Sequence, residues 1–138
     1  ALEFAGTVLG LASGVDRVAG NDRAIDERRV SDAIHRIEQS AHELEEGRLS
    51  LGALAREADM SRYHFLRVFR RLVGQTPHQY VLFLRMHKAA VLLRTTRAPL
   101  TTVALDAGFN YLSTFIRRFR QVMGISPGAY RKHPVRKR

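Results

Sequence analysis

The chain has 138 residues, a formal net charge of +10 and no cysteine. This length allows one compact domain or two small subdomains, and the lack of cysteine excludes disulfides, thiolate zinc sites and thiol nucleophiles. No apolar run approaches the roughly 20 residues of a membrane-spanning helix, and no signal-peptide pattern is expected at the N-terminus.

The charge is divided unevenly along the chain. Residues 1–46 hold five arginines against ten acidic residues, a net charge of −5, whereas residues 47–138 hold eighteen Lys and Arg against three acidic residues, a net charge of +15. This asymmetry indicates a polyanionic partner for the second part. Charge alone leaves nucleic acid, an acidic membrane surface and an acidic protein open as that partner.

The first third of the chain is expected to contain two helices. Residues 2–14 predict a short apolar helix with glycines at four-residue spacing, interpreted as the remnant of an upstream domain or linker, with a dimer contact as the alternative. Residues 15–29 are polar, and a turn is expected at residues 20–22. From the predicted N-cap Ser31, apolar residues at three- and four-residue steps indicate a helix that Gly47 ends.

Three further helices are predicted in the middle of the chain. They cover residues of about 51–58, 62–73 and 77–95, and the capping residues before them are Ser50, Ser61 and Thr76. A tight turn at Asp59 and Met60 separates the first two, and Gly74 ends the second. The buried side of helix 62–73 is expected to consist of Phe65, Val68, Phe69 and Leu72.

The pattern of these helices then repeats. At an offset of 49, Leu51, Leu54, Ala55, Ala58, Asp59 and Met60 return as Leu100, Val103, Ala104, Ala107, Gly108 and Phe109. At an offset of 50, Phe65, Arg67, Phe69, Arg70, Gly74, Pro77 and Tyr80 return as Phe115, Arg117, Phe119, Arg120, Gly124, Pro127 and Tyr130. A short helix, a tight turn and a second helix form a helix-turn-helix unit, whose second helix fits the DNA major groove. Two such units are predicted, with recognition helices at about 62–73 and 111–123.

The outward faces of the two predicted recognition helices carry side chains that suit DNA. Arginine can bond bidentately to guanine, Ser, Tyr and His suit single contacts, and leucine can touch a thymine methyl. The predicted base contacts are Tyr63, His64, Leu66, Arg67, Ser113 and Arg117. The predicted backbone contacts are Arg62, Arg70, Arg71, Thr114, Arg118, Arg120, Arg131 and Lys132. A solvated helix face is the alternative for any single arginine, but Arg67 and Arg117 occupy the same position in both units.

The helix between the two units predicts their spacing. Nineteen residues from Pro77 to Thr95 form a rod of about 28 Å at 1.5 Å per residue. Such a rod can hold two recognition helices about one DNA turn apart, roughly 34 Å. A monomer is therefore expected to read two successive major-groove segments of a long asymmetric site.

Residues of about 31–133 resemble the DNA-binding domain of AraC/XylS-type bacterial transcription regulators. The resemblance is carried by LSLGALAREADMSRYHFLRVFRRLVGQTPHQY and LTTVALDAGFNYLSTFIRRFRQVMGISPGAYRKH. It implies an all-α domain of about seven helices, two helix-turn-helix subdomains on a long helix, and promoter binding. It also implies base-reading positions at Tyr63, Leu66, Arg67, Ser113 and Arg117, and structural positions at Gly124, Pro127 and Tyr130. Two residues depart from the family pattern: Asp59 replaces a glycine, and Leu66 replaces a polar residue.

The resemblance also implies a domain organisation and partners. Residues 1–30 are expected to be the tail of an upstream effector or dimerisation domain, and 31–138 the DNA-binding domain. The expected parts of this domain are subdomain one at 31–76, the linker helix at 77–95, subdomain two at 99–133 and a basic tail at 134–138. The expected partners are double-stranded DNA, RNA polymerase and a second copy bound through the upstream region. Neither a membrane nor a cofactor is expected, and the expected location is the cytoplasm, at the nucleoid.

Three other classes of function are alternatives to sequence-specific DNA binding. Similar domains occur fused to DNA-repair methyltransferases, but these need cysteines that this chain lacks. His35, Glu38 and His42 share one helix face, so a metal site is an alternative to simple exposure, and we expect none. A nonspecific nucleic-acid binder would lose affinity steeply with salt and differ little between sequences. A membrane-surface binder would need a long basic amphipathic helix, which the pattern does not show.

Overall fold

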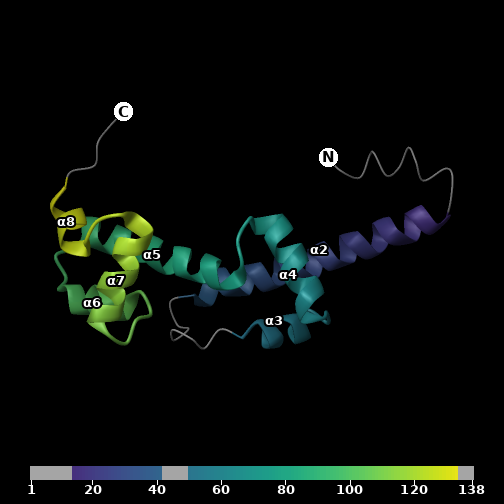
Figure 1. Ribbon diagram of the computed structural model, residues 1–138, viewed down its shortest axis with the longest axis horizontal. Helices are drawn as coiled ribbons and strands as arrows, with labels where there is room; N and C mark the ends of the chain where they lie inside the picture. The colour runs from purple at the N-terminus through teal and green to yellow at the C-terminus, as the bar shows by residue number, and fades with distance from the viewer. Residues whose placement is uncertain (1–13, 42–49, 134–138) are drawn as a thin grey trace.

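The computed structural model describes residues 14–41 and 50–133, and within them the fold is all-α, as predicted. The helices are α2 (Gly14–Ser40), α3 (Leu51–Glu57), α4 (Arg62–Val73), α5 (Pro77–Thr95), α6 (Leu100–Asp106), α7 (Leu112–Met123) and α8 (Pro127–Lys132). The helix predicted at 2–14 and the basic tail at 134–138 lie outside the described residues. The elements form two compact units at opposite ends of α5 (Figure 1).

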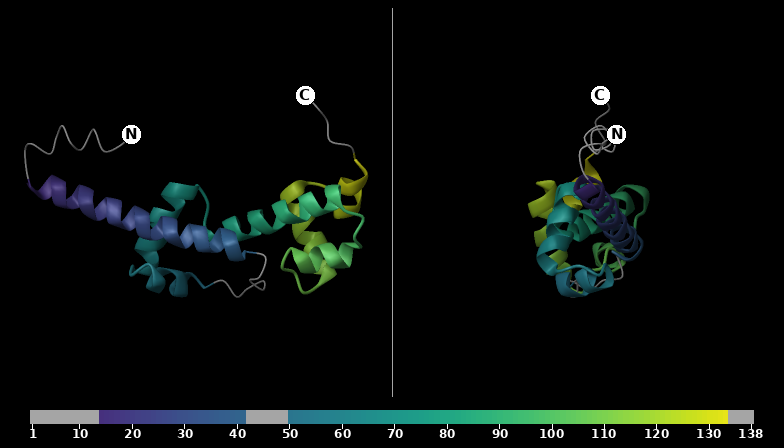
Figure 2. Two further views of the ribbon diagram at one scale, coloured as in Figure 1. Left: turned by 180° about the vertical axis from the view of Figure 1, so that it is seen from behind. Right: turned by 90° about the vertical axis from the view of Figure 1, so that its right-hand side faces the viewer.

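Each unit has its own apolar core, and α5 belongs to both. The first core joins α2, α3 and α4, and α5 contributes Val81 to it. The second core joins α6, α7 and α8, and α5 contributes Met86, Ala89 and Leu93. The molecule is therefore elongated along α5, and the N-terminal half of α2 extends beyond the rest of the first unit (Figure 2).

The N-terminal helix differs from the prediction. α2 continues through residues 20–22, where a turn was predicted, and through Ser31, which is therefore not an N-cap. A glycine inside a helix costs only about 1 kcal/mol. Tertiary packing offsets that cost, because Val30, Ala33 and Ile37 are buried in the first core. The helix ends at Ser40, before the predicted Gly47, which lies outside the described residues.

The predicted caps of the middle helices are confirmed. Ser50 Oγ accepts a hydrogen bond from the Ala53 amide at 3.2 Å, and Ser61 Oγ accepts one from the His64 amide at 3.1 Å. Thr76 forms a reciprocal capping box with Gln79, and Pro77 occupies the first turn of α5. These bonds satisfy amides that have no partner within the helix, so they fix where each helix begins.

The two helix-turn-helix turns have the same hydrogen bond at equivalent positions. The Met60 amide donates to the Ala55 carbonyl at 2.9 Å, and the Phe109 amide donates to the Ala104 carbonyl at 2.9 Å. The residue before each donor has a positive φ, 56° at Asp59 and 97° at Gly108. Aspartate tolerates this left-handed conformation better than most side chains, so Asp59 can replace the glycine of the second turn.

The repeat seen in the sequence is also a repeat in packing. Phe65, Phe69 and Tyr80 pack in series, one pair of rings tilted and the other edge-to-face, with ring centroids 5.9 and 6.1 Å apart. Their counterparts Phe115, Phe119 and Tyr130 follow at 5.7 and 5.5 Å. One residue of the predicted buried stripe is wrong: Leu72 is 38% exposed, and Val73 packs against the first core in its place.

Candidate nucleic-acid interface

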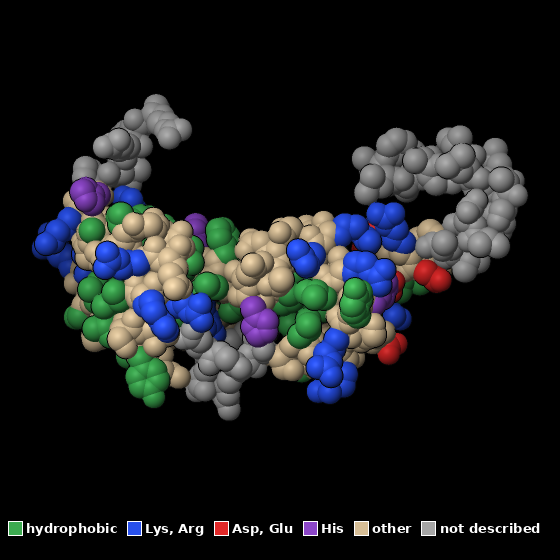
Figure 3. Space-filling view, viewed as in Figure 1, with side chains coloured by type: hydrophobic (Ala, Val, Ile, Leu, Met, Phe, Trp, Pro, Cys, Tyr) green, Lys and Arg blue, Asp and Glu red, His purple; other side chains and the backbone are tan. Residues whose placement is uncertain are grey.

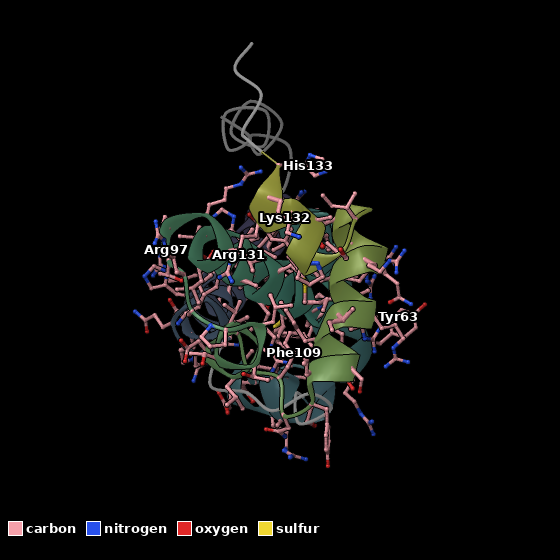
Figure 4. All side chains as sticks on the ribbon, turned by 90° about the vertical axis from the view of Figure 1, so that its left-hand side faces the viewer. Tyr63, Arg97, Phe109, Arg131, Lys132 and His133 are labelled. Atoms are coloured by element: carbon pink, nitrogen blue, oxygen red, sulfur yellow. The ribbon has the colours of Figure 1, made fainter. Side chains whose placement is uncertain are left out.

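The recognition helix of the first unit, α4, presents a basic and aromatic face to solvent. Tyr63 is 80% exposed, and the Arg67 guanidinium carbon lies 5.6 Å from the centroid of its ring. Arg62 and Arg70 are also exposed, whereas Leu66 is half-buried beside them. Figure 4 shows the Tyr63 side chain at the surface of the molecule. This face is therefore free to approach a polyanion.

Two predicted DNA contacts of α4 also contact α2. His64 Nε2 lies 2.6 Å from Asp26 Oδ2, and Arg71 Nη2 lies 3.4 Å from Glu27 Oε1. The same Glu27 oxygen accepts a hydrogen bond from Arg23 at 3.1 Å. Asp26 and Glu27 were missed from the sequence because residues 15–29 were expected to be a polar linker. No local sequence signal indicates them, because their partners on α4 lie 38 and 44 residues later in the chain.

The recognition helix of the second unit, α7, presents a matching face. Ser113, Arg117 and Arg120 are exposed, and Thr114 and Arg118 are half-buried. Tyr111, at the N-cap of α7, is 71% exposed and makes no side-chain cap hydrogen bond. The exposed arginines Arg117 and Arg120 occur at the same helix positions as Arg67 and Arg70 of the first unit.

Arg131, a predicted backbone contact, is half-buried and contacts the end of α5. Its Nε donates to the Leu93 carbonyl near the end of α5 at 3.2 Å, and its Nη2 is buried. A guanidinium at this position complements the carbonyl end of a helix. Lys132, by contrast, is exposed, as a backbone contact requires.

Positive charge covers both units, while the acidic residues lie mainly on α2. On the face shown in Figure 3, Lys and Arg side chains occur over both units, and Asp and Glu occur toward the end where α2 lies. Beyond residue 46 the only acidic residues of the sequence are Glu57, Asp59 and Asp106. Glu57 pairs with Arg36 at 2.7 Å, and Asp59 lies 3.9 Å from Arg29. These pairs lower the residual negative charge near the recognition helices.

The candidate metal ligands on α2 have other contacts. Glu38 accepts a hydrogen bond from the Tyr80 hydroxyl and lies 3.7 Å from His35 Nδ1, while His42 lies outside the described residues. Burial, together with the Glu38 carboxylate, raises the pKa of Tyr80 to about 12. Among residues 14–41 and 50–133, no group of His, Cys, Asp and Glu could hold a metal ion. In the same residues, no helix is both long and apolar enough to span a membrane.

Two helix-turn-helix units on one connecting helix, each with an exposed arginine-bearing recognition helix, define the class of tandem helix-turn-helix proteins. The chain belongs to the AraC-type helix-turn-helix domain family, whose family model matches residues 54–133. This family comprises DNA-binding domains of transcription regulators and not enzymes.

Curated relatives agree with this assignment. The HTH-type transcriptional activator AarP of Providencia stuartii is 37% identical over 84 residues, covering 61% of this chain and 62% of that protein. The Transposon Tn10 TetD protein of Escherichia coli is 31% identical over 115 residues, covering 83% and 80%. The uncharacterized HTH-type transcriptional regulator YdeC of Bacillus subtilis is 34% identical over 85 residues, but the match spans only 29% of its length. Some relatives are thus much longer than the matching region.

Solved structures share the fold. The DNA-binding domain of AdpA, described as a global transcriptional factor and solved with a target DNA, is 32% identical with a TM-score of 0.65, covering 74% of this chain and 88% of that chain. An AraC-type transcriptional regulator from Chromobacterium violaceum is 26% identical with a TM-score of 0.64, covering 85% and 99%.

Proposed function

We propose that the protein binds double-stranded DNA sequence-specifically and thereby regulates transcription, with α4 and α7 in successive major-groove segments. The observation that carries this proposal is the repeated exposed arginine, Arg67 on α4 and Arg117 on α7, at matching positions of two like units. The similarity to the AdpA domain, which was solved with a target DNA, supports it. α5, about 28 Å long, is suited to a spacing of about one DNA turn.

The proposed DNA contacts fall into base contacts and phosphate contacts, according to the exposure and the chemistry of each side chain. Base contacts are assigned to Tyr63, Leu66, Arg67, Ser113 and Arg117. His64 contributes a base contact only through Nδ1, because its Nε2 is bonded to Asp26. Phosphate contacts are assigned to Arg62, Arg70, Arg71, Thr114, Arg118, Arg120 and Lys132.

The whole protein is proposed to act on a promoter together with RNA polymerase, at the nucleoid. The similarity to AarP, a transcriptional activator, supports this role. Dimerisation through the region upstream of residue 31 is proposed as well. Transcription from a selected promoter, measured with and without the protein, tests the proposed action at a promoter. The molar mass of the whole chain, measured by light scattering, tests the proposed dimerisation.

A selection from random duplexes followed by footprinting tests the DNA-binding proposal. We expect one enriched asymmetric site and two protected patches about one helical turn apart. A single protected patch contradicts the placement of both recognition helices. Equal affinity for all sequences, with a steep loss in salt, contradicts sequence-specific reading altogether.

A further inference from the structure

Arg85 is the one charged side chain in the described residues that is buried, and it lies at the middle of α5. It is 4% exposed, and its neighbours along the helix belong to different cores: Val81 to the first and Met86 to the second. Its position is therefore the joint between the two units. Burying a charge at this position carries a desolvation cost, which the contacts of the guanidinium must offset.

The guanidinium of Arg85 contacts both units. Its Nε donates a hydrogen bond to the Ala41 carbonyl at 2.9 Å, just after the last residue of α2 in the first unit. Its guanidinium carbon lies 5.6 Å from the centroid of the Phe109 ring, in the turn before α7 of the second unit. A cation is favourable at both places, at the carbonyl end of a helix and over an aromatic face.

These two contacts link the first unit to the second through one side chain. A bend at the middle of α5 would move Phe109 away from Ala41 and leave the buried guanidinium with fewer partners. Because a buried charge is destabilised when it loses favourable contacts, the arrangement in which Arg85 makes both contacts is favoured over bent ones. Figure 4 shows Phe109 among the packed side chains of the second unit, so its ring is held in place. The neighbouring contact of Phe109 with Phe115, at 5.6 Å between centroids, has the same effect.

We infer that Arg85 is a positioning residue for DNA recognition: by fixing the two units relative to each other, it sets the spacing between the two DNA segments that the protein accepts. The spacing part of this inference rests on the proposed function, because it needs both recognition helices to bind one duplex. The orientation part does not, and it can be measured without DNA.

Arg94 provides a matched control on the same helix. Its guanidinium carbon also lies over an aromatic ring, 4.1 Å from the centroid of Tyr130, and its Nη1 donates to the His133 carbonyl at 3.5 Å. Both partners belong to the second unit, so Arg94 joins nothing across the middle of α5. Replacing Arg94 removes a charge and a cation–π contact but leaves the contacts of Arg85 between the two units in place.

The first experiment measures the distance between the units. Because the native chain has no cysteine, spin labels can be attached through Arg56→Cys on α3 and Thr101→Cys on α6, both at exposed positions. Electron–electron double resonance is expected to give a narrow distance distribution in the labelled parent and with Arg94→Met, and a broad one with Arg85→Met. A narrow distribution in folded Arg85→Met overturns the inference. Arg85→Lys, which keeps the charge but not the guanidinium plane, is expected to be intermediate, and it carries the test if the methionine variant does not fold.

The second experiment measures the spacing that is tolerated in DNA. The selected duplex is altered by adding or removing one to three base pairs between the two segments, and affinities are measured at one salt concentration. The parent is expected to prefer one spacer, and Arg85→Met is expected to reduce that preference by about tenfold, because a loosely held second unit reaches several spacings. An unchanged preference overturns the spacing role. A parent that is indifferent to the spacer overturns the two-segment function itself, while the distance measurement still decides the role of Arg85 in orientation.

Discussion

His64 Nε2 lies 2.6 Å from Oδ2 of Asp26, a residue 38 positions earlier in the chain. This pair joins the first turn of the recognition helix α4 to the part of α2 before residue 31, which the sequence pattern had separated from the DNA-binding domain. The carboxylate requires a proton on Nε2, so a neutral His64 keeps its lone pair on Nδ1. The pair thus decides which ring nitrogen faces away from α2.

Replacing Asp26 should loosen the attachment of α2. Asp26→Asn is expected to lower the free energy of unfolding by about 0.5–1 kcal/mol, because a half-exposed charged hydrogen bond is replaced by a weaker neutral one. Urea unfolding measures the change. Asp22→Asn, one turn earlier on α2 at an exposed position, is the control and should leave the unfolding free energy unchanged. Equal effects of the two substitutions would show that only the charge of α2 matters.

The two repeated arginines should specify bases. Arg67→Ala and Arg117→Ala are each expected to cost about 1–3 kcal/mol of binding free energy at one cluster of bases, and a different cluster for each variant. Binding to a panel of single-base variants of the selected duplex measures this. Arg28→Ala, an exposed arginine on α2, controls for the loss of one positive charge. A uniform loss on every duplex would assign both arginines to the phosphate backbone.

Two glycines of the second unit should respond oppositely to the same added methyl group. Gly124 ends α7 with φ of +82°, and Gly128 lies within α8; a Cβ would meet nothing within 4 Å at either position. Gly124→Ala is expected to cost about 1–2 kcal/mol of stability through backbone strain alone. Gly128→Ala is expected to gain about 0.5 kcal/mol, since alanine is the better helix former. Thermal unfolding of both variants decides, and a loss of equal size at Gly128 would contradict the assignment to backbone conformation.

Tyr80 should make stability fall at high pH. Its pKa is raised from 10.0 to about 12 in the folded protein, so between these values the folded state holds a proton that the unfolded state has lost. The stabilisation is therefore complete below pH of about 10 and is lost as the pH rises toward 12. Urea unfolding should show that the advantage of the parent over Tyr80→Phe shrinks across this range. Tyrosinate absorbance should show a late transition that Tyr80→Phe removes and Tyr111→Phe retains.

The parts of the fold that depend on local sequence were predictable. Helix caps such as Ser61 and Thr76 act within one turn, and glycines such as Gly74 and Gly124 end helices by their own backbone conformation. The repeat allowed the helices of the second unit to be predicted from those of the first, because equivalent residues pack equivalently. The start of α5 at Pro77 was likewise predicted from the capping residue Thr76 before it.

The features that depend on distant partners were not predictable. The linear pattern showed neither that α2 continues through the exposed residues 20–22 nor that Asp26 pairs with His64. Arg131 looked like a basic surface residue, but its partner Leu93 is 38 residues away. The contact of Arg85 with Ala41 was not predicted for the same reason, since Ala41 is 44 residues away. In the candidate site, the exposed faces of α4 and α7 followed from helical periodicity, whereas the engagement of His64 and Arg71 by α2 did not.

The presence of α5 in both cores has a thermodynamic consequence. If either unit unfolded alone, half of α5 would lose its apolar partners: Val81 on one side, or Met86, Ala89 and Leu93 on the other. Unfolding of one unit is therefore coupled to unfolding of the other, and each unit stabilises the other. DNA held by one recognition helix thus also protects the half of the molecule that has not yet reached the duplex, so a protein engaged on half of its site stays folded while it searches for the rest.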